Sequence, residues 1–194
     1  MAAQANTPTT FKVPHNLLTP TETVSVDGQC TLERLVLGSD TYTFASPINW
    51  QATITNTGSA LLVTGNAKAV ACGTCSRCLD TFEFELEGTL EGYFLFSEED
   101  KLEEGMEKDE FEVLPENKII DFEPLIKAAL LIELPLQPLC KSECKGLCAH
   151  CGANLNEGAC NCNKNATAND GITGSENANS GSNPFAVLKN IKFD

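Results

Sequence analysis

The sequence predicts an α+β protein: an antiparallel, β-rich sheet covered by one helix, followed by a small cysteine-rich module and a short C-terminal helix. Three observations favour this class. Apolar and polar residues alternate along much of the first half, one helical segment follows, and six of the ten cysteines lie within residues 140–162. We expect a flexible N-terminal arm over 1–20, a β-rich domain over 21–139, a metal module over 140–162, a disordered linker over 163–183 and a short helix over 184–194.

The alternation that predicts strands is clearest from Thr81 onward. One face of that strand would carry apolar residues, namely Phe82, Phe84, Leu86, Leu90, Phe94 and Phe96. The opposite face would carry glutamates, namely Glu83, Glu85, Glu87 and Glu91. Similar alternations over 48–54 and 61–69 flank a predicted turn at 56–59. Together they predict an antiparallel meander with one buried and one wet face, and Gly88 and Gly92 suggest a bulge or bend.

A helix is predicted near residues 121–134. Asp121 suits its N-cap, and Pro135 and Pro138 stop it. Apolar residues that repeat at helical spacing would face the sheet, namely Leu125, Ala128, Ala129 and Ile132. The acidic run over 97–118 that precedes this helix predicts a mobile loop.

The charge balance is strongly acidic, with a formal net charge of −14 and only two arginines. Non-specific binding to nucleic acid depends mostly on basic side chains, so a broad nucleic-acid surface is not expected. The acidity instead favours a basic protein partner, or serves solubility alone. Neither a secretory signal nor an apolar run of membrane-spanning length is visible, so we expect a cytoplasmic protein with no membrane contact. Thiols stay reduced in that compartment, which favours metal binding over disulfides.

The cysteines are spaced like ligands of zinc. Cys148-Ala149-His150-Cys151-Gly152 has the pattern of a zinc knuckle, since two intervening residues let both sulfurs reach one ion. We predict one or two structural zinc ions. The first site would use Cys75, Cys78, Cys140 and Cys144. The second would use Cys148, Cys151, Cys160 and Cys162.

An alternative grouping stays open, in which Cys75 and Cys78 join Cys148 and Cys151 in a single site. Cys30 and Cys72 are interpreted as ordinary buried or half-buried residues. An iron–sulfur cluster or a redox-active thiol pair is a weaker interpretation, because Phe82 stands where a ferredoxin run requires its next cysteine.

Catalysis finds no support in the sequence. The chain has two histidines and no glycine-rich phosphate loop or nucleophile elbow, so we expect no catalytic residues and no small-molecule substrate. A zinc ion held by four thiolates would keep no open position for a reaction.

The order of the motifs resembles the YceD family, the bacterial large ribosomal RNA subunit accumulation proteins, over roughly residues 20–194. The motifs that carry the resemblance are Cys75-Ser76-Arg77-Cys78-Leu79, Pro138-Leu139-Cys140, Cys144-Lys145-Gly146-Leu147-Cys148, Cys151-Gly152-Ala153-Asn154-Leu155-Asn156 and Asn183-Pro184-Phe185-Ala186-Val187-Leu188.

The resemblance implies a non-enzymatic role in ribosome biogenesis, namely the accumulation of large-subunit (23S) ribosomal RNA. The implied partners are large-subunit rRNA or a pre-ribosome, or a basic ribosomal protein. The long linker over 163–183 departs from the family pattern. A zinc-stabilised interaction module without a ribosomal role is the alternative.

Overall fold

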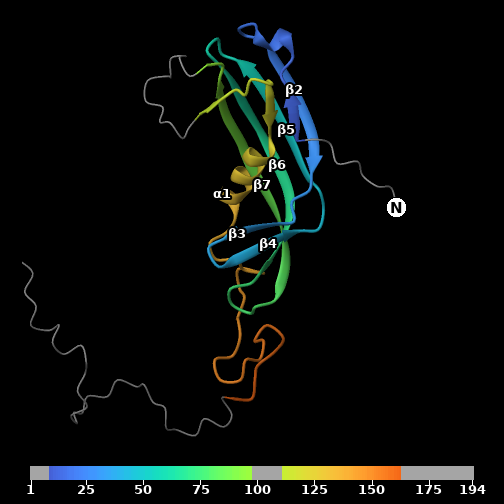
Figure 1. Cartoon of the computed structure of the whole chain (residues 1–194). Helices are drawn as coiled ribbons and strands as arrows, with labels where there is room; N and C mark the ends of the chain where they lie inside the picture. Colours follow the sequence, from blue (N-terminus) through green and yellow to red (C-terminus); the bar gives the residue numbers. More distant parts are fainter. Residues whose placement is uncertain (1–8, 98–110, 163–194) are drawn as a thin grey trace, which may run out of the picture. The chain divides into compact units, whose positions relative to one another are not determined.

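The structure of the chain is a computed structural model that describes residues 9–97 and 111–162 (Figure 1). The chain divides into two compact units, residues 1–159 and residues 160–194. Every helix and strand described below belongs to the first unit. The predictions for most of the acidic run, for the linker over 163–183 and for the closing helix fall outside the described residues.

The main sheet is antiparallel except for one short parallel pair. Its strands are β2 (Thr23–Cys30), β3 (Arg34–Leu37), β4 (Asp40–Phe44), β5 (Ile48–Asn56), β6 (Ala60–Thr74), β7 (Thr81–Leu95) and β8 (Glu112–Val113). Strand β6 is central, because one of its edges pairs with β5 and then β4 while the other pairs with β7. The prediction of an antiparallel sheet with one helix and cysteine clusters is therefore confirmed.

The inner face of the sheet is the face that the alternation predicted. Ile48, Ile54, Leu61, Val63 and Leu90 are all fully buried. The pairing of β6 with β7 runs one to one from Ala60 and Leu95 to Thr74 and Thr81, so no bulge interrupts it. Gly88 and Gly92 therefore do not mark a bulge. They lack side chains where the helix described next packs against the sheet.

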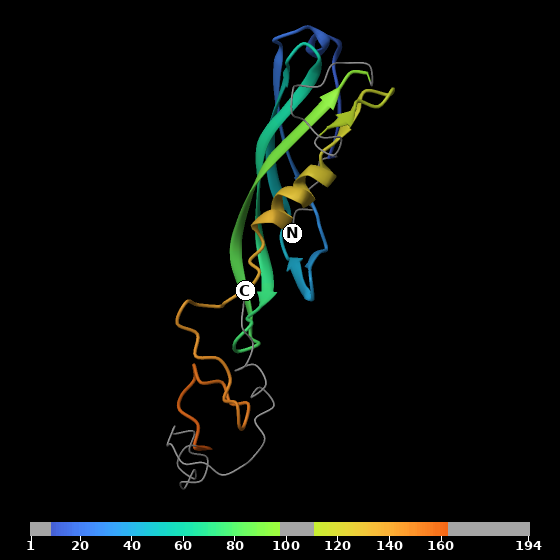
Figure 2. The ribbon, with the colours of Figure 1, turned by 90° about the vertical axis from the view of Figure 1, so that its left-hand side faces the viewer.

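The helix α1 (Glu123–Glu133) packs against β7 and β6 (Figure 2). At Gly88 a Cβ atom would lie 2.5 Å from the carbonyl oxygen of Ala129, so only glycine allows the helix to approach this closely. The N-cap of this helix is Phe122 and not the predicted Asp121, which lies one residue earlier. The carboxylate of Asp121 accepts a hydrogen bond from the N–H of Glu123 at 3.0 Å and so closes the turn that precedes the helix.

The predicted buried face of this helix is right only in part, since Ala129 is buried and Leu125 packs against the core. Ile126, Ala129 and Leu130 are buried, whereas Ile132 is 81% exposed. The segment is almost entirely apolar, so its spacing fits more than one face, and the contact of Ala129 with Gly88 selects the one observed. Within the described ranges, no helix has both the length and the apolar character needed to cross a bilayer.

The prediction of a flexible arm over 1–20 is wrong for its described second half. Strand β1 (Thr10–Lys12) pairs with β9 (Ile119–Asp121), and the 3₁₀ turn η1 (His15–Leu18) follows. Leu17 is fully buried, and its carbonyl oxygen accepts a hydrogen bond from the Asn56 side chain at 2.8 Å. Isolated apolar residues such as Leu17 carry no period, so the sequence did not reveal that they complete the core.

Tyr42 on β4 ties the segment that leaves α1 to the sheet. Its ring is fully buried, and its hydroxyl donates a hydrogen bond to the carbonyl oxygen of Pro135 at 2.8 Å. Gly73 on β6 makes room for the ring, since a Cβ there would lie 2.9 Å from it. The chain beyond Pro135 is therefore anchored beside β6, close to where that strand ends at Thr74.

We expect Gly88→Ala to lower the free energy of unfolding by about 1–3 kcal/mol, because the added methyl group meets helix backbone rather than a movable side chain. Thr89→Ala on the exposed face of the same strand is the matched control and should change it by less than about 0.5 kcal/mol. Urea denaturation measures both variants. Equal stabilities would contradict the close approach of α1.

Candidate metal centre

The turn that joins β6 to β7 carries the first two cysteines of the candidate site. The N–H of Cys75 donates to the carbonyl oxygen of Asp80 at 2.9 Å, and the N–H of Leu79 donates to that of Cys75 at 2.9 Å. Leu79 has a φ of 62°, in the left-handed region that side chains rarely adopt. These contacts close the turn tightly around Cys75 and Cys78.

The segment after α1 wraps this turn and brings in the other two cysteines. The N–H of Ser76 donates to the carbonyl oxygen of Pro138 at 2.8 Å. The guanidinium of Arg77 donates to the carbonyl oxygen of Cys144 at 3.0 Å. The carbonyl oxygen of Arg77 accepts the N–H of Leu147 at 3.2 Å. Two backbone hydrogen bonds and one from the Arg77 side chain therefore hold residues 138–147 against the hairpin.

Four sulfurs meet at this place, those of Cys75, Cys78, Cys140 and Cys144, and all lie within 4.8 Å of one another. The sulfurs of Cys75 and Cys144 are 3.8 Å apart, and those of Cys78 and Cys140 are 3.6 Å apart. Zinc–sulfur bonds of about 2.3 Å in a tetrahedron require sulfur separations of about 3.8 Å, so the spacing fits such an ion.

The same distances do not fit disulfides, whose sulfurs are about 2.05 Å apart. All ten cysteines lie among the described residues, and none forms a disulfide. The cluster is enclosed, because Cys75 is 0% exposed and Cys78 and Cys144 are each 3% exposed. Cys75 and Cys78 thus lie with Cys140 and Cys144, as the first predicted grouping has it, and not with the later pair.

Hydrogen bonds and burial divide the four thiols into two kinds, with a lowered pKa at Cys75 and Cys144 and a raised pKa at Cys78 and Cys140. Burial alone raises the pKa of Cys75, but backbone N–H groups, led by that of Cys140, bring its pKa down to about 6. A hydrogen bond from the Asn156 side chain lowers the pKa of Cys144. Burial raises the pKa of Cys140. Two of the sulfurs are therefore prepared to carry negative charge, which favours a cation among them.

Asn156 is a contributor that the sequence analysis missed. Its side-chain nitrogen donates to the sulfur of Cys144 at 3.3 Å, and its side-chain oxygen accepts the N–H of Lys145 at 2.9 Å. Asn154 donates to the carboxylate of Asp80 at 2.7 Å and so ties the loop to the hairpin. The pair of asparagines stood in the motif that resembles YceD, but spacing rules for metal ligands assign them no role.

Cys148 and Cys151 lie in a tight turn of their own. The N–H of Gly152 donates to the carbonyl oxygen of Cys148 at 2.8 Å, and Gly152 has a φ of 71°. The second predicted set, Cys148, Cys151, Cys160 and Cys162, could also hold a metal. Cys160 and Cys162 open the second compact unit, so the assembly of this set stays a prediction from its spacing.

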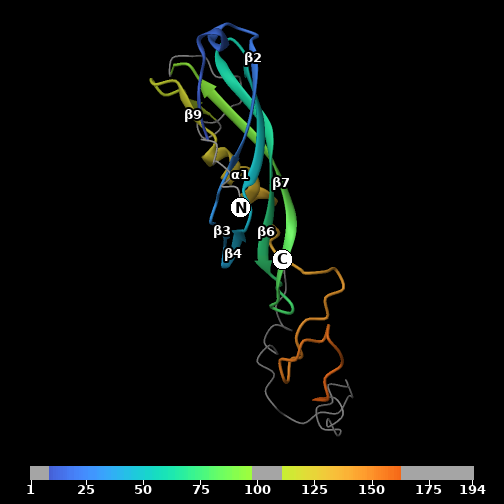
Figure 3. The ribbon, with the colours of Figure 1, turned by 90° about the vertical axis from the view of Figure 1, so that its right-hand side faces the viewer.

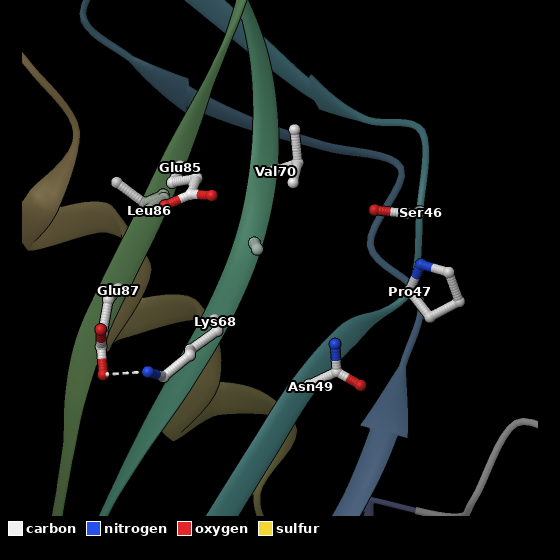
Figure 4. A pocket seen from close by; sticks show the side chains of 9 residues that line it. Ser46, Pro47, Asn49, Lys68, Val70, Glu85, Leu86 and Glu87 are labelled. Carbon is white, nitrogen blue, oxygen red and sulfur yellow. Dashed lines mark ion pairs between the residues drawn. The ribbon is translucent and has the colours of Figure 1, made fainter.

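A hollow of 290 Å³ lies elsewhere, on the outer face of the sheet (Figure 4). The ammonium of Lys68 lies 3.0 Å from the carboxylate of Glu87 there. Hydrogen bonds from Lys68 and Asn66 lower the pKa of Glu87. Neither a cysteine nor a histidine lines this hollow, so it is not part of the thiol cluster.

The fold and the cluster define a cysteine-rich α+β protein whose buried sulfurs could hold a metal ion. Over residues 63–192 the chain matches the family model described as "Large ribosomal RNA subunit accumulation protein YceD", and it belongs to this family. The resemblance seen in the motifs is thereby confirmed. The description concerns accumulation of an RNA and names no reaction.

Three relatives illustrate the match. An uncharacterized protein of Mycobacterium leprae is 31% identical over 133 residues, which are 64% of this chain and 57% of the relative. One of Mycobacterium tuberculosis is 34% identical over 103 residues, 53% of this chain and 48% of the relative. The chloroplastic YCED homolog 1 of Arabidopsis thaliana, named a large ribosomal RNA subunit accumulation protein, is 39% identical over 57 residues, 29% of this chain and 18% of the relative.

The chain thus spans about half the length of the curated mycobacterial relatives it matches. No solved structure matches it.

We expect Leu79→Gly to be more stable than Leu79→Ala by about 1 kcal/mol, although glycine usually weakens a folded chain. Leu79 is 63% exposed, so little packing is lost in either variant, and only glycine relieves the left-handed backbone. Denaturant titration of the two variants under identical metal loading checks the order. The reverse order would show that residue 79 does not adopt this conformation.

Proposed function

We propose that the chain is a non-enzymatic ribosome biogenesis factor that supports the accumulation of large-subunit (23S) ribosomal RNA in the cytoplasm. The family match over residues 63–192 carries this proposal. Two features support it. The buried thiol cluster has the character of a structural site, and the sequence offers no catalytic group.

The proposed cofactor is structural zinc, which binds the two predicted sets of four cysteines. The sulfur separations of 3.6 and 3.8 Å in the first set support an ion of this size and geometry. For the second set the support is the knuckle pattern of Cys148 to Gly152. Zinc would hold the cysteine-rich segment to the end of the sheet, a segment that has little apolar core of its own.

The partner by this proposal is large-subunit rRNA, a ribosomal protein, or both. The net charge of −14 favours a basic protein over naked RNA. Lys141 and Lys145 are exposed in the cysteine-rich segment and could still contact phosphates, while Lys164 lies outside the described residues. Binding through phosphates would weaken steeply as salt rises, whereas a protein partner would show a flatter dependence.

The zinc assignment predicts two ions per chain, counted by native mass spectrometry. Cys144→Ser should release one ion and Cys151→Ser the other. Cys72→Ser is the control and should release none, because Cys72 lies on β6 outside both sets. Visible absorption typical of an iron–sulfur cluster, or an unchanged ion count in Cys144→Ser, would contradict the assignment.

The ribosomal role predicts that depletion of the protein lowers the ratio of large to small subunits and the level of 23S rRNA. Sucrose-gradient profiles and RNA quantification measure both. Re-expression of the full chain should restore the ratio. An unchanged profile would favour the alternative, a zinc-stabilised interaction module that acts outside the ribosome.

A further inference from the structure

One edge of β7 is unpaired along most of its length in the part of the chain that the structure describes. Strand β8 pairs with this edge only at Phe94 and Leu95, and β6 occupies the opposite edge from end to end. Figure 3 shows β7 along one margin of the sheet. A strand edge of this length is a template for another extended chain unless it is protected.

The residues whose backbone groups point to this free edge follow from two hydrogen bonds. The N–H of Leu114 donates to the carbonyl oxygen of Leu95 at 2.7 Å, which puts the backbone of Leu95 on the β8 side. The N–H of Phe96 donates to the carbonyl oxygen of Ser59 at 3.5 Å, so the backbone of Phe96, the residue after Leu95, points to the β6 side.

Since the register has no bulge, the backbone N–H and C=O groups of every second residue, counted back from Leu95, point to the free edge. The first of these, Tyr93, is buried next to the pairing with β8 and is not part of the free edge. Those between Tyr93 and the strand's first residue, Thr81, are Glu83, Glu85, Glu87, Thr89 and Glu91.

Four of the five residues that offer free backbone groups therefore carry a carboxylate, and all five side chains are exposed. Figure 4 shows Glu85 and Glu87 one after the other along this strand, with the dashed ion pair from Lys68 on β6 to Glu87. That ion pair is itself exposed and adds little stability. The free edge is thus both a row of hydrogen-bonding groups and a line of negative charge.

This charge decides what can pair there. A second copy of β7 would bring like charges opposite one another, which is destabilising. The free edge of β2 differs, because its exposed residues are mostly uncharged and hydrogen-bond across to β5, for example Thr23 to Thr55 at 3.2 Å. A positively charged strand matches the β7 edge in both hydrogen bonds and charge.

We propose that the free edge of β7 accepts an extended, lysine- or arginine-rich segment of a partner protein as an additional strand. This inference deepens the ribosomal role proposed above and rests on it for its biological meaning. It names the chemistry of the partner, a basic polypeptide in extended form rather than an RNA.

The test uses the full zinc-loaded chain and a synthetic ten-residue peptide of alternating lysine and threonine. We expect the peptide to bind, and we expect hydrogen exchange to slow at the edge-facing amides of β7 by at least about tenfold. A twin in which every backbone nitrogen is methylated keeps every charge but donates no backbone hydrogen bond, so it should bind at least about tenfold more weakly. Equal binding of the twins, or no slowing on β7, would overturn the proposal.

A charge-matched pair of variants locates the site. Glu85→Lys with Glu91→Lys should weaken peptide binding at least about tenfold, whereas Glu22→Lys with Glu33→Lys makes the same change in net charge at exposed residues outside β7 and should leave it nearly unchanged. Equal weakening by both pairs would mean general attraction and would also overturn the proposal. The depletion experiment reads subunit ratios instead, so failure of strand pairing and failure of the ribosomal role give separate results.

Discussion

The pairing of β6 with β7 is the constraint on which the rest of the structure depends. It fixes which face of the two longest strands meets α1, and it holds the turn with Cys75 and Cys78 at their end. A slip of one residue would send the buried face of β7 to solvent and carry Gly88 away from the helix backbone. The sheet therefore positions the candidate metal centre, although the segment after α1 supplies two of its four sulfurs, those of Cys140 and Cys144.

Hydrogen-bond donors around that turn point to the cysteine sulfurs and stabilise their thiolate form. Backbone N–H groups and the amide of Asn156 point at thiols in a place with little solvent, where such hydrogen bonds are strong. The contacts of Ser76 and Arg77 with the wrapping segment do not involve sulfur at all. The segment thus has two kinds of attachment to the hairpin, one through hydrogen bonds that do not involve sulfur and one through the sulfurs.

The sequence foretold those parts of the fold that repeat with a regular period. The strands over 48–54, 61–69 and 82–91 alternate with hardly an interruption, and so both their type and their buried face were predictable. Tyr93 and Leu95 break the alternation, and both are buried on the opposite face. The spacing of the cysteines predicted their role as ligands but left two ways to complete Cys75 and Cys78, with Cys140 and Cys144 or with Cys148 and Cys151. The fold brings in Cys140 and Cys144. The buried face of α1 was not, since its nearly uniform apolar run contains no information about which side meets Gly88.

Long-range contacts were the other gap. The hydrogen bond from Tyr42 to Pro135 joins residues 93 positions apart, and nothing local to either announces it. Leu17 and Asn156 were missed for the same reason. The hydrogen bond of Leu17 with Asn56 and that of Asn156 with Cys144 form only in the folded chain.

The separation of the sulfur pairs along the chain also has a consequence for biosynthesis. Cys78 and Cys140 are 62 positions apart, so Cys75 and Cys78 leave the ribosome long before Cys140 and Cys144 have been made. During translation the nascent hairpin can form early, but a metal ion that uses all four sulfurs could be held only after Cys144 has emerged. Capture of an ion would thus follow the formation of the hairpin and report that the segment after α1 has been made.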